Sequence, residues 1–249
     1  MKENKEKIIN YFRELEFESG SHKYSHKGKY LNSVSSVIKN FTQSFDADKI
    51  AFLVARKRTR EEGVLVTKED VLAEWEAKKN AACDRGNQTH NFGEQYSLHK
   101  INPNSTKNLI PTTGFERALI HFWDNIPDHI EPFLFELKMY STELSIAGTA
   151  DLILYNTKTG KFIICDYKTN EDLFKNYKGK KLLKPFNDLL DQPFSKYELQ
   201  LSLYQLLFEQ CGFKVESRRI IWLKEDGTYD NLKARDLSSR LKDELTKEW

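Results

Sequence analysis

The chain has 249 residues, of which 39% are hydrophobic and 12% are aromatic. No long proline, glycine or serine tract divides it, so we expect a single domain over residues 1–249 that can bury one sizeable core. The 39 basic and 37 acidic residues leave a net charge of +2, so overall charge does not indicate a nucleic-acid-binding protein. Any such surface must come from a local arrangement of charges.

Cysteine spacing and hydropathy restrict the setting in which the protein works. Cys83, Cys165 and Cys211 are widely spaced, and the N-terminus mixes lysine and glutamate where a secretory leader would be apolar, so we expect a reducing compartment. No apolar run is long enough to cross a membrane, so no membrane partner is expected. The G-x-x-x-x-G-K-[ST] pattern is absent, so we expect no ATP as a cofactor.

Helices are predicted in the first half of the chain and strands in the second. The predicted helices before the strands cover residues 3–17, 33–41, 46–60, 67–98 with breaks, and 113–125. Strands are then predicted over 133–140, 145–155 and 161–168, a helix over 196–211, a strand over 216–224 and a helix over 236–248. This order predicts an α/β fold in which a mixed central sheet is flanked by helices. We expect a helical wall over residues 1–130 and a core over about 131–249.

Hydroxyl groups gather where the second of these helices begins, within the segment from Lys29 to Lys39. Ser33 and Ser35 could hydrogen-bond phosphate, because hydroxyl groups are common phosphate contacts. Asn32 or Ser33 could equally cap the helix, and this is the interpretation that we favour.

The segment from Ala81 to Glu94 places a histidine and a glutamate on one helix face. His90 and Glu94 are four residues apart, so either could reach a cleft. A lone histidine beside arginine and glutamate is more often a solvated or capping residue. Glu136, in the strand predicted over 133–140, is a third candidate, with a cross-strand ion pair as its alternative.

Two aspartates and a lysine interrupt the apolar runs of a predicted hairpin whose turn covers residues 156–160. A hairpin centred between Lys158 and Thr159 places Asp151 opposite Asp166. Lys168 leaves the same face as Asp166, because the two are two residues apart on one strand. Facing carboxylates repel each other and require a cation, either Lys168 itself in a partly buried salt bridge or a hard divalent ion such as Mg²⁺.

With a divalent ion bound, Lys168 could orient or help to deprotonate a water and stabilise charge on a phosphate. The arrangement therefore suits phosphodiester cleavage.

The helix predicted over 196–211 presents polar groups on one face. Its start is predicted from a capping box formed by Ser195 and Glu198. Tyr197, Gln200 and Tyr204 then share one stripe, which is either part of a site or an ordinary surface or core stripe.

A lysine-rich segment with interleaved aromatic residues precedes this helix. It contains Phe174, Tyr177 and the lysines at positions 175, 178, 180, 181 and 184. It is interpreted either as a mobile loop that contacts phosphates and stacks a base, or as a solvated loop.

Three motifs together resemble the PD-(D/E)xK nuclease superfamily and, within it, the RecB-type exonucleases. These are Gly148-Thr149-Ala150-Asp151, Asp166-Tyr167-Lys168-Thr169 and Gln200-Leu201-Ser202-Leu203-Tyr204, in the family's order G-x-x-D, D/E-x-K, Q-x-x-x-Y. The resemblance implies a restriction-endonuclease-like core in which Asp151 and Asp166 bind the metal and Lys168 assists the water. Gln200 and Tyr204 are then expected to line the same cleft.

Two further segments are similar to parts of the same family. Residues 86–90 resemble a G-x-x-x-H segment, which implies His90 as an added metal ligand with Glu94 as the fallback. Residues 22–39 resemble the N-terminal stretch of phage-like and mitochondrial genome maintenance exonucleases. The implied compartment is a bacterial or phage-like cytoplasm, with mitochondria left open.

The resulting hypothesis is a Mg²⁺- or Mn²⁺-dependent DNA exonuclease that acts on ends or single strands. The expected substrate contacts are Thr169, Tyr197, Ser33, Ser35, Lys178, Lys180 and Lys181. The alternatives are a structure-selective or restriction-like endonuclease, and a nucleic-acid-binding module that does not cut. Some relatives hold an iron-sulfur cluster with four cysteines, which three cannot supply, so no cluster is expected. DNA is the expected partner, with a separate helicase or recombination protein as a further one.

Overall fold

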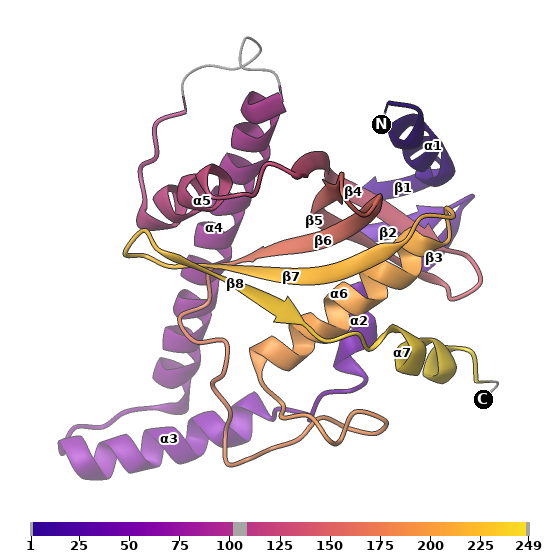
Figure 1. The fold of residues 1–249 in the computed structure, drawn as a ribbon. Coiled ribbons are helices and arrows are strands. Elements are labelled where there is room, and N and C mark those ends of the chain that lie inside the picture. Colours follow the sequence, from indigo (N-terminus) through magenta and orange to yellow (C-terminus); the bar gives the residue numbers. More distant parts are fainter. Residues whose placement is uncertain (1, 102–108, 248–249) are drawn as a thin grey trace.

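The computed structural model describes residues 2–101 and 109–247, and helices precede most of its strands (Figure 1). The first part contains α1 (Lys2–Phe12), β1 (Leu15–Glu18), β2 (Lys23–His26), β3 (Lys29–Ser33), α2 (Val34–Lys39), α3 (Ala47–Glu62), α4 (Lys68–Ile101) and α5 (Gly114–Asp124). The second contains β4 (Ile130–Ser141), β5 (Ile146–Asn156), β6 (Lys161–Lys168), α6 (Pro193–Glu209), β7 (Val215–Leu223), β8 (Tyr229–Ala234) and α7 (Ser238–Leu245). No helix within the described ranges is long and apolar enough to span a membrane.

One mixed sheet organises the described residues. Its order is β1-β2-β3-β5-β6-β7-β8, and β4 pairs along β5. The pairs β3·β5 and β6·β7 are parallel and the others are antiparallel. The predicted α/β class, with a mixed sheet flanked by helices and a largely helical first half, is confirmed.

Two hydrophobic cores lie on the two faces of this sheet. Along β6, Phe162 and Ile164 belong to the core that includes residues of α6, while Cys165 and Tyr167 belong to the core with α4 and α5. This alternation follows from the two-residue period of a strand. It brings α6 to one face of the central strands and α4 with α5 to the other (Figure 1).

The edge of β5 that faces β6 is interrupted at the G-x-x-D motif. Antiparallel pairing with β6 runs from Asn156↔Lys161 to Leu152↔Cys165, and parallel pairing with β3 occupies Ile146 and Ala147. Since β4 pairs with β5 over the whole length of that strand, β3 and β6 must share the other edge. Residues 148–151 lie between them, at a fork where β5 and β6 separate.

The first strands were not predicted. The helix expected over 3–17 ends at Phe12, and β1, β2 and β3 form an antiparallel meander up to Ser33. Lys27 and Gly28 make the second turn with φ angles of +50° and +76°, which suit a hairpin turn. These strands are short and only half-buried, so their apolar alternation is weak. β8 was missed for the same reason.

Helix starts were predicted with mixed success. At the starts of the helices predicted over 67–98 and 113–125, Thr67 and Asp70 exchange capping hydrogen bonds, and Thr113 and Glu116 form a complete capping box. The box predicted at Ser195 is wrong, because α6 begins earlier, at Pro193 after the N-cap Gln192. Helix α4 is continuous, without the predicted breaks.

A long-range ion pair explains the error at α6. Glu198 is 1% exposed, and its Oε1 accepts hydrogen bonds from Arg235 N at 3.0 Å and Arg235 Nε at 2.8 Å. The carboxylate therefore ties α6 to the segment after β8, and it is not free to cap the helix.

Candidate active site

The fork between β5 and β6 holds the motif residues in the predicted register. The pairs from Leu152↔Cys165 to Asn156↔Lys161 are all equidistant from the midpoint between Lys158 and Thr159. The predicted centre of the hairpin is therefore confirmed. Asp151 and Asp166 follow immediately beyond the last of these pairs.

Asp151 bridges the fork with its side chain. Its Oδ2 accepts a hydrogen bond from Tyr167 N at 2.9 Å, and it lies 3.3 Å from His90 Nδ1. Burial would raise the pKa of Asp151, but the charge and hydrogen bond of His90, together with the charge of Lys168 and the hydrogen bond from Tyr167 N, outweigh burial and lower it. The largely buried carboxylate is therefore stabilised as an anion.

His90 reaches the fork from α4, on the face of the sheet that this helix covers. Its Nε2 lies 3.1 Å from the Tyr167 carbonyl oxygen, which can only accept a hydrogen bond. Burial would lower the pKa of His90, but the charge of Asp151 and their hydrogen bond raise it to about 9. With Nε2 donating to Tyr167 O, Nδ1 is the ring nitrogen that faces Asp151.

Glu136 completes a group that could hold a metal ion. One ligand atom each from His90, Glu136 and Asp151 lies within 4.8 Å of the others. Glu136 sits on β4 between the pairs Phe135↔Leu152 and Leu137↔Ala150, which places it opposite Asp151. Its φ of +46° is unusual for a residue other than glycine and marks a local distortion of the strand.

The chemistry of this group fits a divalent cation. Burial first, and then the negative charge of Asp151, raises the pKa of Glu136 to about 7. A cation between the two carboxylates would remove this repulsion, and two carboxylate oxygens with one imidazole nitrogen can serve as ligands of a divalent metal ion. His90 also donates its second ring nitrogen to a backbone carbonyl, as metal-binding histidines usually do.

Asp166 and Lys168 form a largely buried ion pair beside this group. Asp166 is 1% exposed, and its Oδ2 is paired with the Lys168 amine. Burial would lower the pKa of Lys168, but the charges of Asp166 and Asp151 hold it well above its usual value. Burial and the charge of Asp151 raise the pKa of Asp166 to about 6. Lys168 is therefore a fixed cation next to the candidate metal group.

The candidate metal group thus differs from the predicted ligand set. The sequence predicted Asp151, Asp166 and His90, with Glu94 as fallback. The structure groups Glu136 with Asp151 and His90, while Asp166 is engaged by Lys168. Glu94 lines a cavity of about 670 Å³ together with His90 and Glu136 but is not within the three-residue group.

Helix α6 presents its predicted stripe to the same region. The ring centroid of Tyr197 lies 4.4 Å from Lys168 Nζ, and Tyr197 donates a hydrogen bond to Asn170 Oδ1 at 2.9 Å. Gln200 donates to the hydroxyl of Tyr204, also at 2.9 Å. The structure therefore brings Tyr197 into contact with the catalytic candidate Lys168.

Gly148, the first residue of the G-x-x-D motif, makes room for Tyr204. A Cβ atom at position 148 would lie 2.8 Å from Tyr204 Cε1 and 2.8 Å from Val34 Cγ2. Tyr204 is 5% exposed and Val34 is 2% exposed, so neither side chain has free space. The glycine allows α6 and α2 to pack closely against β5.

The remaining predicted substrate contacts are one threonine next to the fork, two serines at the start of α2 and three lysines before α6. Thr169 is buried and lines two cavities next to the fork. Ser33 caps α2, accepting a hydrogen bond from Ser36 N at 3.1 Å, as the capping interpretation predicted. Ser35 is exposed on that helix.

The three predicted lysine contacts, Lys178, Lys180 and Lys181, are exposed. Two of them lie over the Tyr177 ring, and Lys181 O accepts a hydrogen bond from Gln43.

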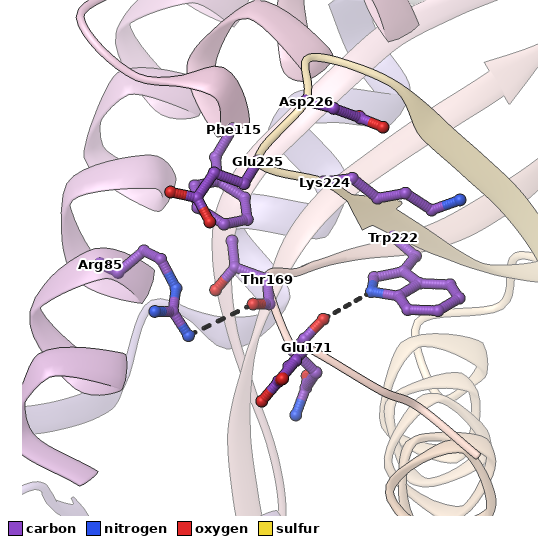
Figure 2. Close-up of a pocket in the computed structure, with 9 residues that line it drawn as sticks. Arg85, Phe115, Thr169, Glu171, Trp222, Lys224, Glu225 and Asp226 are labelled. Atoms are coloured by element: carbon purple, nitrogen blue, oxygen red, sulfur yellow. Dashed lines mark hydrogen bonds between the residues drawn. The ribbon is translucent and has the colours of Figure 1, made fainter. Parts of the chain in front are cut away.

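Three cavities lie near the fork, and residues of α4 contribute to the lining of each. The cavity with Glu94 and one of about 280 Å³ that includes Lys168 and Tyr197 share His90. The second shares Arg85, Thr169 and Asn170 with a third cavity of about 500 Å³, shown in Figure 2. Sequence reasoning did not single out Arg85, although it directly precedes the Gly86 to His90 segment. Asn170 and Trp222 carry no motif and were also missed.

The comparisons identify the family. A family profile for the PD-(D/E)XK nuclease superfamily matches residues 112–245, more than half of the chain, so the protein belongs to this superfamily. Membership implies a nuclease, a hydrolase that uses divalent metal ions. The chain is also similar to a solved structure titled "Crystal structure of SSO0001", with 14% identity over 85% of this chain and 81% of that chain and a TM-score of 0.30. A search of curated proteins found no match.

Proposed function

We propose that the protein is a Mg²⁺- or Mn²⁺-dependent DNA exonuclease that acts at the ends of DNA, including the ends of single strands. The observation that carries the proposal is the convergence at one fork of His90, Glu136 and Asp151 with the Asp166–Lys168 ion pair. Superfamily membership adds the reaction class, hydrolysis of a phosphodiester bond.

The metal ligands are proposed to be His90, Glu136 and Asp151, with Asp166 beside them. A divalent cation held there supplies Lewis-acid stabilisation of the negative charge that develops on the phosphoryl group. The backbone of Tyr167 orients two of these side chains, since its N–H binds Asp151 and its carbonyl binds His90. Asp151 and His90 are therefore held in position without a bound cation.

Lys168 is proposed to stabilise the transition state as a cation. Because the pKa of its amine is held above the usual value, it acts as a hydrogen-bond donor to a phosphoryl oxygen or a water, and not as a base. Asp166 and the ring of Tyr197 fix the direction of the amine. Gln200 and Tyr204 lie on the next turns of α6, are joined by a hydrogen bond and are proposed to line the same cleft.

A preference for ends or single strands is supported by the aromatic side chains near the fork. Tyr197 and Trp222 line the two cavities that meet at Thr169 and Asn170, and such rings can stack on unpaired bases. In a duplex, stacking between neighbouring base pairs hides the faces of the bases from these rings.

A cleavage assay tests the proposal. End-labelled linear DNA and a closed single-stranded circle are incubated with Mg²⁺, Mn²⁺ or EDTA, using wild type, Asp151→Asn and Lys168→Ala. Lys100→Ala is the control, since it removes a lysine whose amine is paired with Asp124 at the surface. We expect metal-dependent degradation of linear DNA alone, reduced about 100-fold or more by both site variants.

Two outcomes would contradict the proposal. Cutting of the closed circle would show an endonuclease. DNA binding that needs no metal and gives no cleavage, and that is equal in wild type and both site variants, would indicate a binding module.

A further inference from the structure

Arg85 stands where the two cavities next to the fork meet. It is a residue of α4 that lines both the cavity containing Lys168 and the larger cavity containing Trp222. Its guanidinium lies over the ring of Phe115, with its carbon atom Cζ 5.4 Å from the ring centroid. Figure 2 shows Arg85 on one side of the larger cavity and Trp222 on the other.

The hydrogen-bonding capacity of Arg85 is largely unused. An arginine carries five N–H donors. In the described residues, Arg85 makes one long hydrogen bond, from Nη2 to the Thr169 carbonyl at 3.5 Å, and its Nε is buried without a partner. No carboxylate of the described chain is within ion-pair distance of it. By contrast, Arg218 and Arg235 are paired with Asp236 and Glu198.

A partly buried guanidinium with free donors is suited to bind an anion. Leaving such donors unpaired is costly, and the planar fork of arginine matches the oxygens of a phosphate. Its neighbour Thr169 directly follows Lys168 in the chain, so an anion on Arg85 would lie beside the phosphate at the catalytic lysine. On this basis the geometry points to Arg85 as the residue that binds the phosphate adjacent to the scissile one. This inference rests on the proposed nuclease function.

The larger cavity then receives the nucleoside attached to that phosphate. The indole of Trp222 is held in place by a hydrogen bond from Nε1 to the Asn170 carbonyl at 2.7 Å. Exposed carboxylates of Glu171, Glu225 and Asp226 also line this cavity, and the amine of Lys224, which lines it as well, is paired with Asp230. The exposed carboxylates disfavour further phosphates, so the subsite takes one phosphate at Arg85 and not a continuous run of backbone.

Binding of single-stranded DNA tests the inference. All proteins used for binding carry Asp151→Asn to prevent cleavage, and a fluorescent oligonucleotide is titrated at several salt concentrations. Arg85→Gln is expected to raise Kd about tenfold, and to lower the slope of log K against log salt by about 0.7, the value for one lost phosphate contact on a single strand. Arg85→Lys, which keeps the charge without the fork, is expected to raise Kd less and to retain the slope.

The control is Lys100→Gln, which removes one charge from the same helix, and it is expected to leave both the Kd and the slope unchanged. An unchanged Kd in Arg85→Gln, or a raised Kd with the full salt slope, would overturn the inference, because the second result would indicate a structural role. Wild-type protein is assayed for cleavage in parallel. If it does not cleave DNA, the proposed function fails. If it cleaves while Arg85→Gln binds normally, only the assignment of Arg85 fails.

Discussion

The side chain of Asp151 accepts a hydrogen bond from the backbone N–H of Tyr167 at 2.9 Å, directly beyond the last β5–β6 pair. This contact satisfies a backbone donor at the point where the two strands separate. It also brings the carboxylate next to His90 and Glu136. The same hydrogen bond therefore closes the hairpin and positions a candidate metal ligand.

Substitution of Glu136 is expected to weaken metal binding. Glu136→Gln keeps the size of the side chain but removes one of three converging ligands, so we expect at least a tenfold loss of Mn²⁺ affinity in isothermal titration calorimetry. Glu131→Gln, near the start of β4, is the matched control. Equal affinity in the two variants would exclude Glu136 from the site.

Adding a methyl group at Gly148 is expected to destabilise the fold. The new Cβ would lie 2.8 Å from buried atoms of both Tyr204 and Val34, and overpacking of this kind costs about 1–3 kcal/mol. Urea unfolding measures the loss. Gly20→Ala is the control, because nothing lies within 4 Å of its added Cβ. Unfolding of Gly148→Ala at the wild-type midpoint would show that α6 does not pack as described.

Acid unfolding is expected to depend on Glu116, the capping-box residue of α5. Burial would raise the pKa of this carboxyl group, but hydrogen bonds from Thr112 and Thr113 outweigh burial and lower it below 4.5. An acid with a lowered pKa contributes stability that is present above pH 4.5 and is lost as the pH falls through the folded-state pKa.

The variant Glu116→Gln tests this contribution. It should cost about 1 kcal/mol at neutral pH and lose less further stability on acidification than wild type does. Denaturant unfolding across the acidic range measures both effects. If the unfolding free energies of wild type and Glu116→Gln fall in parallel as the pH is lowered, Glu116 does not contribute to acid unfolding.

Removing the ring beneath Lys168 is expected to slow catalysis. Tyr197→Ala loses a cation–π contact with a desolvated amine, worth about 1–2 kcal/mol, which corresponds to about a tenfold lower kcat. Tyr197→Phe keeps the ring and loses only the hydrogen bond to Asn170, so it should retain most of the activity. A similar loss in both variants would assign the effect to the hydroxyl group.

The hairpin and its charged residues could be predicted from sequence because they depend on local pattern. The turn and the alternation of β5 and β6 define which residues face each other, and the register was predicted correctly. Pairing of Glu136 with Asp151 depends instead on how β4 aligns with β5, including an irregularity after Pro132 and the positive φ of Glu136. Neither feature has a local sequence signature.

Long-range contacts also explain why Arg85 and Glu198 were misjudged. Glu198 has the spacing of a capping residue, but Arg235 is paired with it across 37 residues of sequence. Arg85 contacts Thr169, which directly follows β6, and Phe115 of α5, and only the packing of α4 against these two elements brings them near. Tertiary contacts of this kind override local propensity.

The most direct measurement for the account is the location of bound Mn²⁺ in a crystal of the protein, read from anomalous scattering. We expect one Mn²⁺ ion among His90, Glu136 and Asp151, with Lys168 beside it. No manganese at this fork, in a protein that cleaves DNA with Mn²⁺, would contradict the central claim.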